Sequence, residues 1–224
     1  MRLALVMIGL LLLTPQTARA QRGFSLFGSR TTSLYSLAAN DAVQKDLGVA
    51  GDAAARLREL SEQHRDALTK ATSSLGIDFG ELGDLPQAER NAKLRAVSAQ
   101  TAAITNQLHD EFQPRLAAIL EPGQLERLKQ IQLQAQGAEA LATPAVAAAL
   151  ALSDEQQRKL AELSAEYQRR QDQLTGDFQQ RFARIRELNA ERDKRAFALL
   201  TAAQKAKWDE LIGKPFDLAA LRRR

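Results

Sequence analysis

Apolar side chains recur at helical spacing through most of the chain, and this periodicity constrains the fold more than any other feature. They follow one another at intervals of three, four or seven residues along two segments, as expected when one face of an α-helix is buried. The two stripes consist of Leu94, Val97, Thr101, Ile104, Leu108, Phe112, Leu116 and Ile119, and of Leu160, Leu163, Tyr167, Leu174, Phe178, Phe182, Ile185 and Leu188. The polar and apolar alternation typical of a strand does not extend over any useful length. We therefore predict an all-α fold of elongated amphipathic helices or helical hairpins, with no β-sheet.

The chain is an imperfect duplication. A shift of 103 residues places residues 40–49 over 143–152, and a shift of 80 places 119–124 over 199–204. The difference of 23 residues means that the first unit carries an insertion, which includes the Gly- and Pro-containing stretch 75–86. Helix-start signals share positions in the two units along with the leucines, and this favours a true repeat over generic helical similarity.

The repeat and the two ends of the chain predict five parts. They are a signal peptide at 1–20, an N-terminal linker at 21–39, a first helical unit at 40–137, a second at 138–216 and a basic C-terminal tail at 217–224. Within the second unit, residues 154–199 form either one long helix or a hairpin that turns back near Gly176. Periodicity leaves both arrangements open.

The first twenty residues have the three parts of a secretory signal peptide. Arg2 is followed by an apolar run over Leu3–Leu13 and by a small-x-small cleavage site at Ala18–Ala20. The run is too short to span about 30 Å of hydrocarbon, which favours cleavage near Ala20 over retention as an anchor. We expect an exported, periplasmic protein, and no later segment is apolar enough for stable membrane insertion.

Composition excludes several kinds of chemistry. The chain has no cysteine, so a disulfide, a thiol nucleophile and a Cys-ligated metal are all excluded. Loss of the signal peptide lowers Lys and Arg from 31 to 29 against 27 acidic residues, so the net charge of +4 falls to +2 and favours no nucleic-acid partner. The two histidines, His64 and His109, have no metal-ligand partner three or four residues away. Because nucleophile and phosphate-binding motifs are also missing, we expect neither a cofactor nor an enzyme.

Helix-capping motifs recur at three positions. Ser153 and Gln156 can form a capping box, in which each side chain bonds the backbone N–H of the other residue. Thr201 and Gln204 have the same spacing. The third occurrence is weaker and consists of Pro122 and Gln124. The motif residues are Leu152, Ser153 and Gln156, then Leu200, Thr201 and Gln204, then Pro122 and Gln124.

Arginine and phenylalanine side chains crowd the second long segment. The candidate binding surface consists of Arg169, Arg170, Phe178, Arg181, Phe182 and Arg184. One interpretation is a solvated helix face beside a core stripe. The other is a surface that holds flexible polypeptides loosely, because arginine and aromatic groups offer charge and apolar contact without demanding one geometry.

The sequence resembles the Spy/CpxP-like family of exported helical proteins, named for a Leu-Thr-x-x-Gln motif. The matching residues are Leu152–Gln156 and Leu200–Gln204, with a weaker match at Leu120–Gln124. The resemblance implies helical hairpins, often dimerised into a curved cradle, and roles in envelope stress. Some members are ATP-independent chaperones and others respond to metals. Self-association is left open, because a duplicated chain could supply by itself what a dimer supplies in shorter members.

From the surface and the resemblance we expect a non-enzymatic, periplasmic, chaperone-like protein that binds unfolded or partly folded envelope proteins without ATP. The alternative is a structural or adaptor protein of the envelope with one specific partner. A metal-responsive sensor is the third reading, and the scarcity of His, Met and Cys counts against it.

Overall fold

The computed structural model describes residues 33–76, 85–175 and 177–222, and over these residues the protein is all-α, with no strand. This confirms the predicted fold class. The signal peptide and most of the predicted linker lie outside the described residues.

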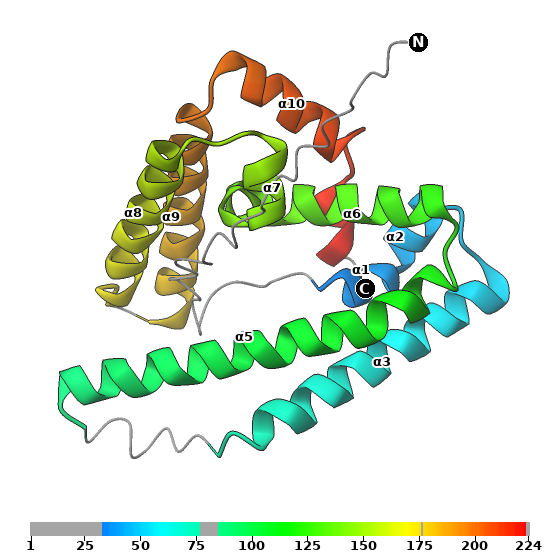
Figure 1. The fold of residues 1–224 in the computed structure, drawn as a ribbon, viewed down its shortest axis with the longest axis horizontal. Helices are drawn as coiled ribbons and strands as arrows, with labels where there is room; N and C mark the ends of the chain where they lie inside the picture. The colour runs from blue at the N-terminus through cyan, green and yellow to red at the C-terminus, as the bar shows by residue number, and fades with distance from the viewer. Residues whose placement is uncertain (1–32, 77–84, 176, 223–224) are drawn as a thin grey trace, which may run out of the picture.

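Each unit contains a short helix, two long helices that form a hairpin, and a helix that follows the hairpin (Figure 1). The first unit consists of α2 (Asp41–Asp46), α3 (Gly51–Ser73), α5 (Gln87–Ala117) and α6 (Pro122–Gln136), and the second of α7 (Pro144–Ala149), α8 (Asp154–Asp172), α9 (Phe178–Ala198) and α10 (Ala202–Ile212). The starts of α7 and α8 lie 103 residues after those of α2 and α3, and the start of α10 lies 80 residues after that of α6, as the two sequence shifts predict. The insertion therefore lies at the tip of the first hairpin, where α3 and α5 have 23 and 31 residues against 19 and 21 in α8 and α9.

Two hydrophobic cores follow the two units. The first includes Leu57, Leu116 and Leu128, and the second includes Leu141 and Tyr167, all of them almost completely buried. Helix α6 lies at the centre of the molecule and is followed by the 3-10 helix η1 (Gly137–Ala142), which contacts α7, α8 and α9 (Figure 1). Helices α6 and η1 thus form one continuous segment that connects the hairpins of the two units.

The predicted linker at 21–39 contains a helix. Helix α1 (Leu34–Ala38) is buried against α3 and α6, with Tyr35 and Leu37 only 3% and 1% exposed. The Asn40 side chain caps α2 as expected from the sequence, but a helix also precedes it. Five residues are too few to show helical periodicity, and long-range packing stabilises α1.

The predicted C-terminal tail also packs onto the protein. Residues Leu218–Arg222 form the 3-10 helix η2 beside α2, and Phe216 and Leu221 pack against the first core. Gln134 of α6 fixes the chain between α10 and η2. Its amide donates to the Ile212 carbonyl at 2.7 Å, and its oxygen accepts from the Phe216 N–H at 2.8 Å. The end of the second unit is therefore anchored on the first.

Residues 154–199 form a hairpin and not one long helix. Helix α8 ends at Asp172 and α9 begins at Phe178, where Asp177 caps the new helix. The stripe predicted to run unbroken through Phe178 and Phe182 is wrong, because these two side chains are 75% and 46% exposed. Because α9 is a separate helix, the spacing of the α8 stripe does not decide which of its faces is buried. The buried residues of α9 include Leu188 and Ala196.

Among the described residues, no helix combines the length and the apolar character needed to cross a membrane.

Candidate functional site

The two complete capping motifs form the boxes expected from their sequences. Ser153 Oγ accepts from the Gln156 N–H at 3.2 Å, and Gln156 Oε1 accepts from the Ser153 N–H at 3.0 Å. Thr201 and Gln204 repeat these contacts at 3.2 and 2.9 Å. The boxes satisfy backbone N–H groups that have no partner inside the first turns of α8 and α10.

The same two glutamines also bond to each other. Gln156 Nε2 donates to Gln204 Oε1 at 2.7 Å, and Gln204 Nε2 donates to Gln156 Oε1 at 3.0 Å. Their amides donate as well to the carbonyls of Leu199 and Ala151, at 2.9 and 3.4 Å. This glutamine pair joins the starts of α8 and α10 to the ends of α9 and α7. The sequence predicted two separate caps and missed the link between them.

The leucine of each complete motif is buried, with Leu152 and Leu200 only 6% and 4% exposed in the second core. The motifs therefore hold the second unit together, and their polar atoms bond within the protein.

The first unit keeps only part of this arrangement. Pro122 occupies the first turn of α6, and Gln124 Oε1 accepts from the Glu121 N–H at 3.0 Å. The Gln124 amide donates to the Leu47 carbonyl at 3.1 Å. Alanine at position 53, the counterpart of Gln156, removes the second member of the pair.

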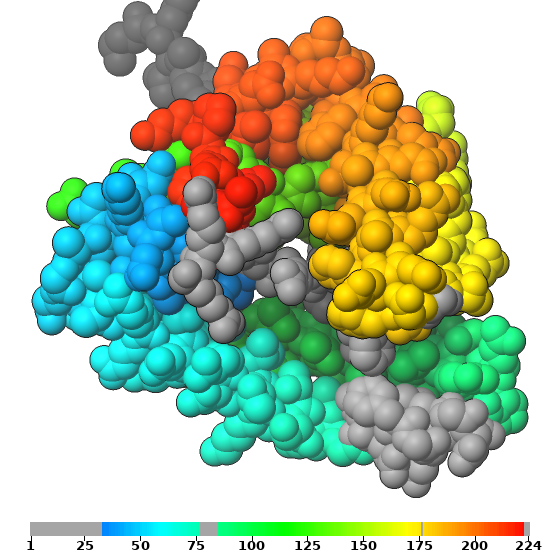
Figure 2. Space-filling model, turned by 180° about the vertical axis from the view of Figure 1, so that it is seen from behind, coloured from blue at the N-terminus to red at the C-terminus, as the bar shows by residue number. Residues whose placement is uncertain are grey.

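Three of the six predicted surface residues lie together on one face of α9. Phe178, Arg181 and Phe182 have the spacing that places side chains on one side of a helix. The two phenyl rings stack with centroids 6.1 Å apart and planes 15° apart, and the Arg186 guanidinium lies 5.3 Å from the Phe182 centroid. We call these four residues the α9 patch. Figure 2 shows the start of α9, in yellow, at the surface of the molecule.

The other three predicted residues do not belong to the α9 patch. Arg184 pairs with Glu187 at 2.6 Å. Arg170 binds Glu191 through both guanidinium nitrogens at 3.0 and 3.1 Å and lies 4.7 Å from the Tyr167 ring centroid, so it joins α8 to α9. The hydrogen bond from Arg170 lowers the pKa of Glu191 to about 2.

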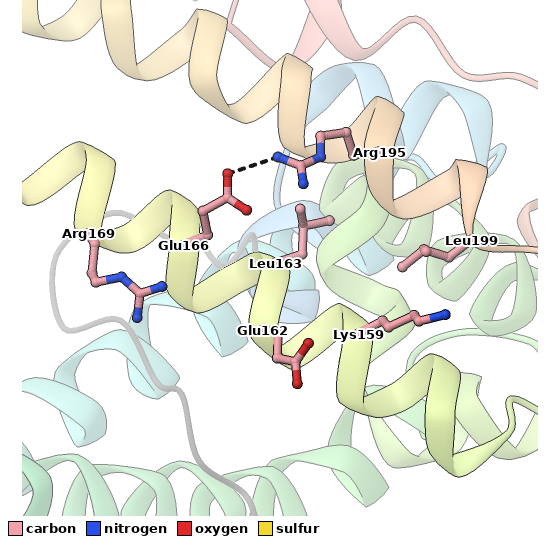
Figure 3. Close-up of a pocket in the computed structure, with 7 residues that line it drawn as sticks. All are labelled: Lys159, Glu162, Leu163, Glu166, Arg169, Arg195 and Leu199. Atoms are coloured by element: carbon pink, nitrogen blue, oxygen red, sulfur yellow. Dashed lines mark hydrogen bonds and ion pairs between the residues drawn. The ribbon is translucent and has the colours of Figure 1, made fainter.

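The remaining residue, Arg169, lies beside a groove between α8 and α9 that sequence reasoning missed. The groove has a volume of about 390 Å³, and Figure 3 shows Glu166 and Arg195 reaching across it to form an ion pair of 2.8 Å. A similar groove of about 290 Å³ lies between α3 and α5. Both grooves could have been predicted from the sequence if the two repeat shifts had been applied to the polar residues as well as to the leucines.

An aromatic and histidine cluster anchors α1 in the first core. Tyr35 stacks on His64 with centroids 4.1 Å apart, Phe112 meets both rings edge-on, and the Tyr35 hydroxyl lies 3.4 Å from His109 Nδ1. Burial, with a smaller effect of the Asp110 charge, raises the pKa of Tyr35 to about 12. Burial and then the nearby His109 lower the pKa of His64, so a neutral imidazole packs here. The His64 side chain is therefore buried with these rings, at 8% exposed.

Within the described part of the chain, no group of three or more His, Asp or Glu side chains is placed to hold a metal ion. Comparison of the chain with family models, with curated proteins and with solved structures found no match.

Proposed function

We propose that this protein is an exported, non-enzymatic chaperone-like protein of the envelope that binds unfolded or partly folded polypeptides without ATP. The observation that carries the proposal is the α9 patch. Phe178 and Phe182 are the two most exposed large hydrophobic side chains in the described residues, and they stack in solvent beside Arg181 and Arg186.

An exposed stacked aromatic pair suits the capture of unfolded chains. Phenyl faces gain apolar contact from any accessible hydrophobic segment, while arginines attract carboxylates and backbone carbonyls. Neither group requires one fixed partner geometry. The patch lies at the start of α9, outside the second core, so clients can reach it while that core stays intact.

The resemblance to the Spy/CpxP-like family supports the same proposal. It accounts for the two Leu-[Ser/Thr]-x-x-Gln motifs, the helical hairpins and the export signal expected at residues 1–20. N-terminal sequencing of protein recovered from the periplasm tests export, with a mature start expected just after Ala20.

The proposal predicts that purified protein suppresses aggregation of a chemically denatured model client without ATP. The double variant F178S/F182S should lose most of this suppression, because it removes the exposed apolar pair and leaves the helix charges unchanged. L218S is the matched control, since Leu218 is also exposed, at 37%, but lies outside the α9 patch. Both changes are at the surface, so each should alter stability by no more than about 0.5 kcal/mol per site.

Absence of suppression by the unaltered protein at several-fold molar excess over the client would overturn the proposal. A saturable one-to-one complex with a single envelope protein, without general suppression, would support the adaptor alternative instead.

A further inference from the structure

Each hairpin carries a groove, and the two grooves occupy equivalent positions in the repeat. The groove in the second unit is lined by Lys159, Glu162, Leu163, Glu166, Arg195 and Leu199 (Figure 3). The groove in the first unit is lined by Arg56, Glu59, Leu60, Gln63, Arg115 and Ile119. The shifts of 103 and 80 residues relate these two sets of six member by member, whereas the seventh lining residues, Arg169 and Ala118, have no counterpart in the other groove.

The two grooves also have similar charged residues at their edges. Glu59 corresponds to Glu162, and a cation one turn earlier is Arg56 in one groove and Lys159 in the other. All four side chains belong to exposed residues. Exposed helix positions tolerate most substitutions within about 0.5 kcal/mol, so the stability of the fold does not require this agreement.

An arginine from the second helix bridges each groove. Arg195 bonds Glu166 at 2.8 Å, and its guanidinium lies 5.6 Å from the centroid of the Tyr167 ring. In the first unit Arg115 bonds Gln63, and its guanidinium lies 4.6 Å from the centroid of the Phe112 ring. In both units the arginine thus bonds the facing helix at equivalent positions, Gln63 and Glu166, while the ring beneath it belongs to its own helix in the first unit and to α8 in the second.

Other positions of the repeat have diverged. The buried Gln44 corresponds to Ala147, and the capping Gln156 corresponds to Ala53. Contacts that support local structure have therefore changed between the units. Three groove charges have been kept, at Arg56 and Lys159, Glu59 and Glu162, and Arg115 and Arg195, although Gln63 stands where the second groove has Glu166. This contrast points to binding at the grooves.

We propose that the two grooves are equivalent peptide-binding sites, each holding an extended segment that places an apolar side chain on the leucine floor and a carboxylate beside the groove cations. The proposal deepens the proposed function and rests on it for the class of ligand. Leu60 and Leu163 form the floors of the grooves, with Ile119 and Leu199 beside them.

Charge and size favour this occupant. The lining of the first groove carries Arg56 and Arg115 against Glu59, an excess of one positive charge. With Arg169 included, the second groove has three cations and two carboxylates, the same excess. Volumes of about 390 and 290 Å³ are at the lower end for small-molecule sites and suit one or two side chains of a chain lying along the hairpin.

Two sites in one chain make binding bivalent. A client with two acidic-apolar segments binds its second segment intramolecularly once the first is held, which raises the overall affinity without any new contact. Single weak sites then suffice to hold a long unfolded chain while short segments exchange freely.

The test uses a fluorescein-labelled peptide of alternating leucine and aspartate, with leucine–lysine and serine–aspartate peptides for comparison. Purified protein should bind the leucine–aspartate peptide at two sites and the other two at least roughly tenfold more weakly, as expected for the loss of a charge-assisted contact or an apolar anchor. R56E and K159E should each leave one site, and R56E/K159E should bind at least roughly tenfold more weakly at both. Arg56 and Lys159 are chosen because they lie on exposed helix surface, where substitution leaves the cores intact.

K129E/K205E is the matched control, since it changes the net charge equally on the exposed surfaces of α6 and α10. Its affinity should stay within about twofold of the unaltered protein if local contacts and not net charge hold the peptide. An equal loss in the control would overturn the proposal, as would no peptide binding or equal binding of the leucine–lysine peptide. A concentration-dependent dimer abolished by R56E/K159E would assign the grooves to a second copy of the chain and would also overturn it.

The aggregation assay separates this inference from the proposed function. Suppression of aggregation without peptide binding overturns the groove sites and leaves the proposed function standing. Peptide binding at two sites without suppression overturns the proposed function and leaves the grooves as peptide sites.

Discussion

Replacing Gln156 with alanine tests whether the glutamine pair holds the second unit together. The Gln156 side chain makes four hydrogen bonds, to the Ser153 N–H, to the Leu199 carbonyl and reciprocally to Gln204, at 2.7 to 3.0 Å. A truncation at this position therefore affects the start of α8, the end of α9 and the start of α10 together.

The expected loss of stability follows from these contacts. A hydrogen bond contributes a net 0.5–1.5 kcal/mol, and water replaces part of the lost bonding at a half-buried site, so Q156A should cost about 2 kcal/mol. Q204A removes the same reciprocal pair and should cost about as much. Because the two variants share that pair, Q156A/Q204A should cost about 3 kcal/mol, a coupling of about 1 kcal/mol.

Urea unfolding followed by the fluorescence of Trp208 measures these losses. Trp208 is the only tryptophan, and it lies 7% exposed in the second core on α10, so its emission reports this unit. Far-UV circular dichroism on the same samples reports both units. Q124A is the matched control, because Gln124 makes two such bonds and pairs with no glutamine, so it should cost about 1 kcal/mol.

Additivity within about 0.3 kcal/mol for Q156A and Q204A would contradict this prediction, since it would mean that the reciprocal bonds contribute nothing. A loss in Q124A equal to that in Q156A would refute it as well, because the structure assigns the larger effect to the pair. Q124A/Q156A should be additive, since these residues share no partner.

Three further predictions concern the first unit. Burial lowers the pKa of His64 below its ordinary value of 6.5, so the unfolded chain binds this proton more readily and the free energy of unfolding should fall as the pH drops through 6.5. Urea midpoints measured between pH 7 and pH 5 test this. H64F should reduce the pH dependence of the midpoint, whereas H109N should retain it. Arg127 bonds Asp46 at 2.7 Å and the Lys214 carbonyl at 2.7 Å, so R127M should cost about 2 kcal/mol in urea unfolding, and an unchanged midpoint would contradict the packing described for the returning C-terminus. The bond from Arg127 lowers the pKa of Asp46 below 3.8, so the stability from this pair should persist at neutral pH and be lost as the pH falls below that value.

Local signals in the sequence located the helix starts well. Asn40, Ser153 and Thr201 each precede a helix in the structure, because a capping side chain bonds backbone groups only two or three residues away. Those contacts depend on residues already adjacent in the chain, so the sequence alone contains them.

Periodicity was less reliable near the hairpin turn. Phe178 and Phe182 continue the spacing of the α8 stripe, yet they follow a turn, and after it the buried face is set by contact with α8 and η1. The α1 and η2 segments were missed for a related reason. Each is short, and each is stabilised by contacts with residues far away in the sequence.

The all-α class, the duplication and the capping motifs could be predicted from the sequence, because they depend on spacing between near neighbours and on similarity between two segments. The contact between Gln156 and Gln204, the bond from Arg170 across the second hairpin and the exposed stack of Phe178 and Phe182 became visible only in the folded protein. The tertiary structure also brought the groove residues of each unit together across two helices. The physical reason is that these contacts join helices whose relative placement depends on how both cores pack, and no local pattern encodes that placement.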